Sequence, residues 1–292
     1  MLLSRLALSL VLAGLLLGGC AKTPSEHAVL APALDRTIET GSIAPAAAAL
    51  ISQPLPERIF FPGPLAGRTV EVASAADIVL YPGEVVLTFD DGPRAGKTSQ
   101  VLTTLDEFGV KATFLMLGSA AQANPKLAQQ VALEGHTVGS HTFSHVDLGT
   151  LSPQEALDEI AKGERAVSLA LAGAGRSLSP FFRFPYLSQD GFLRTNLTQG
   201  GVVVLDVTID SKDYYKDTPG KVAARTLARL DARGSGVILF HDIHQRTVDM
   251  LPDFLAQLKD RGYSVVRLVA KDQGVFGRSL ITAEAPPVAI GL

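Results

Sequence analysis

Two adjacent carboxylates, Asp90 and Asp91, end an otherwise apolar stretch of this 292-residue sequence, residues 85–93, which reads VVLTFDDGP. A β-branched apolar run that stops at Gly-Pro predicts a buried strand followed by a turn. Acidic side chains at the end of such a strand are costly to bury unless a cationic side chain, a metal ion or a proton meets them. The rest of the sequence must therefore supply such a partner.

Polar side chains that could serve as this partner follow other apolar runs, where further strands are predicted to end. Because the carboxyl ends of parallel strands lie together, these residues should converge on one site, around the ring of a barrel or at the switch point of an open sheet. They are His141 and His145 after 136–140, Arg183 within 181–184, Asp210 and Asp213 after 201–207, and His241 and Asp242 after 236–240.

The segment HTFSH carries two imidazoles four residues apart, His141 and His145. On one helical turn, side chains at this spacing face the same way and can bind one metal ion. A carboxylate from Asp90 or Asp91 would complete three ligands and leave coordination positions for water and substrate. An HxxxH pair alone is a weak signal, and the nearby carboxylates together with His241 favour a metal site over surface histidines.

These residues must be positioned by the elements around them. Strands are predicted at 85–89, 112–117, 136–140, 181–184, 201–207, 236–240 and 263–268, with helical patterns between most of them. Helices are expected to begin at Asn124-Pro125, at the capping box of Ser152 and Glu155, and at Thr218-Pro219. This alternation predicts a parallel α/β fold and leaves a barrel and an open sheet as alternatives.

The N-terminal region has the pattern of an export signal. Arg5 supplies a positive charge, residues 6–17 form an apolar run too short to span a membrane comfortably, and small residues lead to Cys20. Cys20 is the only cysteine of the sequence, so we predict a lipoprotein signal peptide over residues 1–19 with Cys20 lipidated. An ordinary export signal that contains a cysteine is the alternative.

Changes in composition divide the remaining chain. Residues 20–56 are rich in Ala, Pro, Ser and Thr and are predicted to form a flexible tether, and 57–83 an N-terminal cap segment. The α/β domain is expected over 84–270, followed by a loose tail over 271–292. The formal charge of −3 gives no basic footprint for nucleic acid.

Five motifs occur in an order and spacing that resembles the polysaccharide deacetylases of carbohydrate esterase family 4, the NodB-homology group. They are TFDDGP (88–93), HTFSH (141–145), RFPY (183–186), DSKDY (210–214) and LFH (239–241). The similarity covers residues 84–268, about two-thirds of the chain, and five ordered motifs are far more specific than any one of them. It implies a distorted (β/α)₇ barrel.

The resemblance also implies roles for individual residues. Asp91, His141 and His145 would bind a divalent metal, usually Zn²⁺, with Co²⁺, Mn²⁺, Ni²⁺ and Fe²⁺ as alternatives. Asp90 would be the general base that takes a proton from the attacking water. His241 would be the general acid that protonates the leaving amine.

The supporting residues are implied in the same way. Arg183 would hold Asp90, and Asp213 would orient His241 and favour its protonated form. The backbone N–H of Tyr186 would help to stabilise the oxyanion, and Leu239 would line the acetyl pocket. The fourth motif commonly ends in Trp, and here it ends in Tyr214. Tyrosine keeps an aromatic wall with a polar tip, so the substitution concerns substrate fit more than chemistry.

The leading functional interpretation is a metal-dependent hydrolase that removes N-acetyl groups from a GlcNAc-containing polysaccharide, either peptidoglycan or an exported glucosamine polymer. An O-acetyl esterase acting on a xylan-like polymer uses the same chemistry and stays an alternative. A silent polysaccharide-binding lipoprotein and an iron oxygenase are further alternatives, which the acid–base set of Asp90 and His241 disfavours. The anchor predicts a membrane-bound protein facing the periplasm or the cell exterior, and one domain on a tether predicts a monomer. Loop, cap or solvated positions are assigned to Asp206, Asp242, Asp249 and His244.

Overall fold

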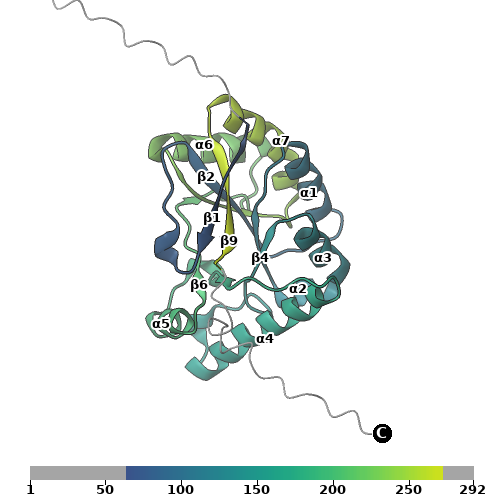
Figure 1. The fold of residues 1–292 in the computed structure, drawn as a ribbon, viewed down its shortest axis with the longest axis vertical. Helices are drawn as coiled ribbons and strands as arrows, with labels where there is room; N and C mark the ends of the chain where they lie inside the picture. The colour runs from purple at the N-terminus through teal and green to yellow at the C-terminus, as the bar shows by residue number, and fades with distance from the viewer. Residues whose placement is uncertain (1–63, 272–292) are drawn as a thin grey trace, which may run out of the picture. The chain divides into compact units, whose positions relative to one another are not determined.

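A computed structural model of the protein describes residues 64–271, and every strand pairing among them is parallel (Figure 1). The parallel α/β fold expected from the sequence is thus confirmed. The strands are β1 (Ala66–Val72), β2 (Glu84–Asp90), β3 (Thr113–Met116), β4 (Thr137–Ser140), β5 (Phe181–Phe182), β6 (Val203–Val204), β7 (Ile209–Asp210), β8 (Gly236–His241) and β9 (Ser264–Ala270).

Strand β2 is the strand around which the sheet is organised. It pairs with β8 along Val85 to Asp90 and with β3 from Thr88 to Asp90. Six of its seven residues are buried, as expected for a β-branched strand covered on both faces. Asp90 therefore lies in the sheet directly beside His241, its register partner in β8.

The sheet extends from β2 in two directions. From β2 it continues through β3, β4 and β5 to β6 on one side, and through β8 to β7 on the other. No pairing joins β6 to β7 within residues 64–271, so the sheet is not closed at that point. The distorted (β/α)₇ closure that the motifs implied stays an expectation.

Strand β1 belongs to the sheet, although the segment that contains it was expected only as a cap. It pairs with β9, whose first residues pair with the start of β2. Only Val70 and Val72 of β1 are buried, so its sequence carries a weak strand signal. The strand sits at the edge of the sheet, in front of the other strands in Figure 1.

The helices connect the strands and cover the sheet. In Figure 1, α7, α1, α3 and α2 follow one another along one side of the sheet. The predicted capping box is confirmed at α4, where the Ser152 amide donates to Glu155 Oε2 at 2.9 Å. The helices are α1 (Thr98–Glu107), α2 (Gly118–Ala123), α3 (Pro125–Leu133), α4 (Pro153–Ala172), α5 (Gly191–Gln199), α6 (Pro219–Arg233) and α7 (Gln245–Asp260).

Apolar side chains pack on both faces of the sheet. The largest core cluster fills the space towards α1, α3, α6 and α7, and a second joins single residues of β2, β3, β5 and β8 to β1 and β9. A third cluster joins α4 and α5 to β5 and β6. This two-sided burial fixes the strand ends rigidly, which is what a site assembled from several strand ends needs.

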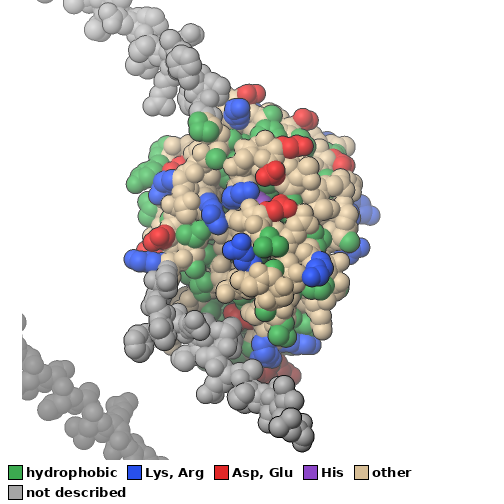
Figure 2. Space-filling view, turned by 45° about the vertical axis from the view of Figure 1, so that its right-hand side comes forward, with side chains coloured by type: hydrophobic (Ala, Val, Ile, Leu, Met, Phe, Trp, Pro, Cys, Tyr) green, Lys and Arg blue, Asp and Glu red, His purple; other side chains and the backbone are tan. Residues whose placement is uncertain are grey.

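On the face shown in Figure 2, basic and acidic side chains are interspersed. Between residues 64 and 271, no helix combines the length and apolar character needed to cross a membrane.

The expected signal peptide, lipidation at Cys20, the tether and all but the first residue of the C-terminal tail lie outside the described residues.

Candidate active site

The two carboxylates of the first motif occupy different positions at the end of β2. Asp90 is the last residue of the strand and is 2% exposed. Asp91 follows with a positive φ of 75°, and its amide donates to the Leu115 carbonyl at 3.2 Å. A non-glycine residue in this region is uncommon, and here it marks a turn at the edge of a pocket that both aspartates line.

The HTFSH segment is an irregular loop after β4, and the expectation of a helical turn is wrong. Thr142 and His145 have positive φ values of 68° and 60°, which bring the rings of His141 and His145 to a centroid separation of 5.0 Å. The carbonyls of Thr142 and Phe143, which a helical turn would use for its own hydrogen bonds, instead accept from the amides of Gly118 and Ser119. The two imidazoles meet as predicted, but by loop geometry.

Helix α4 holds this loop in place. Glu159 Oε1 accepts hydrogen bonds of 2.6 Å from both the amide and the hydroxyl of Ser144. Gly163 lies directly against the loop, since a Cβ at Gly163 would come within 2.3 Å of the carbonyl carbon of Thr142. The Thr142 carbonyl also accepts from the Gly118 amide at 2.9 Å. The absence of a side chain at position 163 thus allows the loop to approach.

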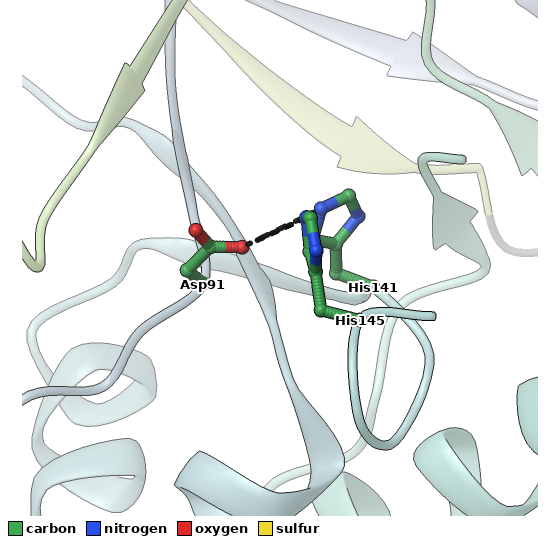
Figure 3. Close-up of side chains that lie close together, drawn as sticks. All are labelled: Asp91, His141 and His145. Atoms are coloured by element: carbon green, nitrogen blue, oxygen red, sulfur yellow. Dashed lines mark ion pairs between the residues drawn. The ribbon is translucent and has the colours of Figure 1, made fainter. Parts of the chain in front are cut away.

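Asp91, His141 and His145 form a cluster that fits a divalent metal ion (Figure 3). Asp91 Oδ1 lies 3.6 Å from His141 Nε2 and 3.5 Å from His145 Nε2. Ligand atoms around a tetrahedral ion with bonds of about 2.1 Å are separated by about 3.4 Å. Asp91 Oδ1 is also buried without a hydrogen-bond partner among the described residues, which is costly unless a cation meets it.

The ring orientation of His141 suits a metal ligand. Its Nδ1 lies 2.8 Å from the Arg183 carbonyl oxygen, so Nδ1 carries the hydrogen and Nε2 keeps its lone pair towards Asp91. Burial lowers the pKa of His141, against the opposing effect of Asp90 and Asp91. The neutral imidazole that a metal requires is therefore the favoured form.

Arg183 connects Asp90 to the floor of the site. Its guanidinium is 1% exposed, and Nη1 donates to Asp90 Oδ1 at 2.7 Å and to Thr88 Oγ1 at 2.8 Å. Nε donates to the Leu205 carbonyl at 3.0 Å. A buried ion pair with several hydrogen bonds orients its partner strongly, so Asp90 is fixed towards the pocket.

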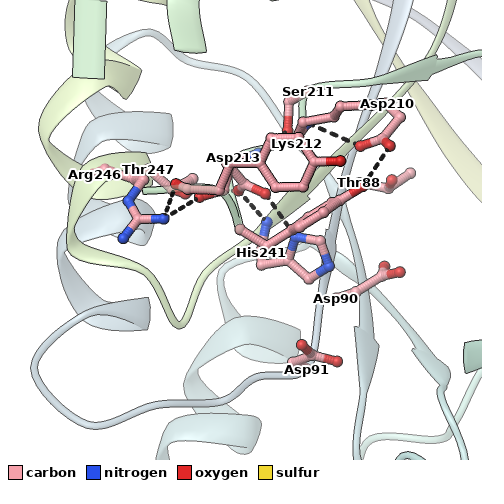
Figure 4. A network of polar contacts seen from close by, with 12 residues as sticks. Thr88, Asp90, Asp91, Asp210, Ser211, Lys212, Asp213, His241, Arg246 and Thr247 are labelled. Carbon is pink, nitrogen blue, oxygen red and sulfur yellow. Dashed lines mark hydrogen bonds and ion pairs between the residues drawn. The ribbon is translucent and has the colours of Figure 1, made fainter. Parts of the chain in front are cut away.

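On the opposite side of the pocket, His241 forms a charged pair with Asp213 (Figure 4). His241 Nδ1 lies 2.7 Å from Asp213 Oδ1, and the His241 amide and Thr247 Oγ1 donate to Asp213 Oδ2 at 2.7 and 2.6 Å. Burial opposes the charge of His241. The hydrogen bond and charge of Asp213, assisted by Asp90 and Asp91, outweigh burial and raise the pKa of His241 to about 9. His241 thus holds a proton at neutral pH.

The pocket between these groups has a volume of about 350 Å³. Leu239 and Tyr214 line it, and the Tyr214 ring lies 5.6 Å from the His241 ring at an interplanar angle of 89°. The Tyr214 hydroxyl donates to Asp210 Oδ2 at 2.9 Å, so the residue that stands in place of Trp is held in one orientation. Tyr186, with a φ of 58° and 66% exposed, packs edge-on against His145 at the pocket mouth.

One residue differs from its sequence interpretation, and a second is more buried than expected. His244, assigned to solvent, lines the pocket and is half-buried, and burial lowers its pKa. Asp242 lies in the loop after β8, as assigned, but it is completely buried, and burial raises its pKa to about 7. The only sequence signal was their position just after a strand that ends in the LFH motif.

Comparisons with known proteins identify relatives of the chain. The family model for polysaccharide deacetylases matches residues 80–205. The chain is 34% identical over 215 residues to a chitin deacetylase from Colletotrichum lindemuthianum, a match that covers 70% of this chain and 85% of that relative.

Two bacterial proteins are also similar. Identity to the peptidoglycan-N-acetylglucosamine deacetylase PgdA of Listeria monocytogenes is 34% over 184 residues, covering 63% of this chain and 38% of PgdA. The chain thus spans well under half the length of that relative. The solved structure of the Bdellovibrio bacteriovorus peptidoglycan deacetylase Bd3279 matches with a TM-score of 0.65 at 33% identity, over 76% of this chain and 61% of that one.

Proposed function

Because this chain belongs to the polysaccharide deacetylase family, we propose that it is a metal-dependent hydrolase that removes N-acetyl groups from a GlcNAc-containing polysaccharide at the cell envelope. One observation carries the proposal. A buried carboxylate, Asp90, and a protonated imidazole, His241, line the same pocket as the three candidate metal ligands. Amide hydrolysis requires a base for the water and an acid for the leaving nitrogen, and the pocket offers both.

The candidate ligands are Asp91, His141 and His145. Two imidazoles and one carboxylate suit Zn²⁺, and a divalent metal held there would lower the pKa of a water molecule and polarise the acetyl carbonyl. Asp90 takes the proton of the attacking water, and Arg183 holds Asp90 in the orientation that this transfer needs.

His241 donates its proton to the leaving nitrogen, which departs as the amine of glucosamine. Asp213 keeps Nδ1 of His241 hydrogen-bonded, so that Nε2 is the proton donor towards the pocket. We assign the Tyr186 N–H to the developing oxyanion, and Leu239 and Tyr214 to the walls around the acetyl group and the sugar.

The cellular setting follows from the N-terminal sequence. We propose that residues 1–19 are a lipoprotein signal peptide, that lipidated Cys20 anchors the protein to a membrane, and that 20–56 tether the domain. The protein would then act as a monomer facing the periplasm or the exterior. Mass spectrometry of the membrane fraction tests the anchor: a diacylglycerol on Cys20 is expected, and Cys20→Ser should release the protein from the membrane.

Acetate release tests the activity. The full-length protein, purified in detergent, is incubated with chitopentaose, peptidoglycan or acetylated xylan, with Zn²⁺ or with a chelator. We expect metal-dependent acetate release from the first two substrates, and its loss in Asp90→Asn. Asp206→Asn is a matched control, because Asp206 is an exposed, ion-paired aspartate outside the pocket. Release from acetylated xylan alone would replace the proposal by an O-acetyl esterase, and no release from any substrate would leave a binding protein.

A further inference from the structure

A further carboxylate lies next to the site, on the residue that follows His241. Asp242 is 0% exposed, although the residues 64–271 place no Lys or Arg side chain in an ion pair with it. It does not line the pocket, so it is not available to a substrate. A buried carboxylate without a cation is costly, and its contacts therefore need an explanation.

The Asp242 carboxylate contacts the turn after β2 and the first residue of α1, and its Oδ1 has no hydrogen-bond partner among the described side chains. Asp242 Oδ2 accepts a hydrogen bond from the Thr98 hydroxyl, and Thr98 Oγ1 accepts one of 2.7 Å from the Arg94 amide. The carboxylate also lies over the Cα of Gly92, because a Cβ there would come within 2.2 Å of Oδ2 and 2.4 Å of Oδ1. Asp242, Thr98, Arg94 and Gly92 thus form a clasp between two loops.

The position of the clasp gives it a specific effect. The pairing of β2 with β8 ends at Asp90 and His241, and no backbone hydrogen bond joins the two described loops beyond that point. The clasp extends the contact between these two chain segments beyond the paired strands, because Asp242 lies against Gly92. Gly92 directly follows the candidate ligand Asp91. The backbone at Asp91, with its positive φ, is thereby held against the loop that follows His241.

We propose that Asp242 and Thr98 are positioning residues that hold the Asp91 carboxylate in place for metal binding and fix its distance from His241. The proposal rests on the proposed function of the Asp91, His141 and His145 cluster. Groups that orient metal ligands from outside the ligand set typically change metal affinity by about 10- to 100-fold when removed.

The test compares Thr98→Val, Asp242→Ala and Thr98→Ser in the full-length protein. Valine has the shape of threonine but neither donates to Asp242 nor accepts from Arg94, whereas serine keeps the hydroxyl. Zn²⁺ affinity is measured on the metal-free protein by competition with a chromophoric chelator, and unfolding temperature by calorimetry. Thr226→Val is the matched control, because Thr226 is equally buried in α6 and its hydroxyl donates only to the Val222 carbonyl.

We expect Thr98→Val and Asp242→Ala to weaken Zn²⁺ binding about 10- to 100-fold and Thr98→Ser by less than threefold. Thr226→Val should change the unfolding temperature without changing the affinity. Zn²⁺ affinities within threefold of wild type in Thr98→Val and Asp242→Ala would overturn the proposal. Failure of both variants to fold while Thr226→Val folds would also overturn it, in favour of a purely structural clasp. A wild-type protein that binds no Zn²⁺ would instead contradict the proposed function.

Discussion

Replacement of Asp213 by asparagine should convert His241 from a proton donor at neutral pH into a neutral imidazole. Asparagine can still accept from the His241 amide and from Thr247 through one oxygen, but its NH₂ group then faces His241 Nδ1. Nδ1 can pair with that group only as an acceptor, which disfavours the imidazolium. Burial, which lowers the pKa of His241, stays unchanged.

The size of the effect follows from the pKa of about 9 against an ordinary value of 6.5. At about 1.36 kcal/mol per unit, this difference corresponds to about 3.4 kcal/mol in favour of the protonated form. Without the Asp213 charge the pKa should fall below 6.5, so at pH 7.5 the protonated fraction drops from about 97% to under about 9%. We therefore expect kcat to fall at least tenfold at that pH, with the alkaline limb of the pH profile moving below 6.5.

The free energy of unfolding should also depend on the protonation of His241, and it should fall as His241 loses its proton. Since the folded-state pKa of His241 is raised, its stabilisation is complete below pH 6.5 and is lost as pH rises through about 9. Metal-free wild-type protein should therefore lose stability between pH 6 and 9.5, by up to about 3.4 kcal/mol from this group. In Asp213→Asn this dependence should be absent.

Proton NMR of the His241 ring in the metal-free protein gives the pKa of His241 directly. Urea unfolding at pH 6 and at pH 9.5 gives the free energy of unfolding at the two ends of the expected transition. Asp206→Asn controls for the loss of an ion-paired aspartate elsewhere, since Asp206 pairs with Arg194 away from His241. The reasoning is refuted if His241 in folded Asp213→Asn still titrates near 9.

Three further perturbations have defined outcomes. Gly163→Ala places a Cβ about 1 Å inside normal contact with Thr142, so it should displace the HTFSH loop and weaken Zn²⁺ binding at least tenfold in chelator competition. Unchanged affinity would show that the loop adapts. Removal of Zn²⁺ by dipicolinate should abolish acetate release and lower the unfolding temperature, because a metal at 100 times its Kd stabilises the folded protein by about 2.7 kcal/mol. An unfolding temperature that does not change with chelator would exclude a bound metal. Tyr214→Phe breaks the bond to Asp210 and should raise KM for chitopentaose a few-fold with kcat nearly unchanged, whereas an equal fall in kcat would point to a part in the chemical step.

The sequence predicted the convergence of Asp90, Asp91, His141 and His145 because strand ends and motif spacing are local properties. It did not predict how the two histidines meet. The HTFSH loop takes its shape from Gly163 and Glu159 of a helix that follows it, and the spacing of four residues suggested a helical turn that the structure lacks.

Elements with few buried residues were also missed. Helix α5 buries only Leu193 and Leu197 among its residues, so its periodicity was too weak to detect. Strands β5 and β6 are shorter than the apolar runs that predicted them, because those runs continue into loop residues that are also buried, Arg183 and Phe184 after β5 and Leu205 after β6. The burial of Asp242 depends on Thr98, which lies 144 residues away in the sequence, and no local pattern records such a contact.

The pairing of β1 with β9 has a consequence for the order in which the chain can fold. Thr69 in β1 pairs with Arg267 in β9, so this contact closes a loop of about 200 residues, among the slowest kinds of contact to form. The steps from β2 to β6 join strands that are consecutive in the chain, and they can assemble while β9 is still being made. We expect pulse-labelling hydrogen exchange to show amides of β2 to β6 protected before those of β9. Until that last step both edges of β1 would be unpaired, and docking of β9 covers one of them, so the interval before β9 docks is the period of greatest risk of aggregation.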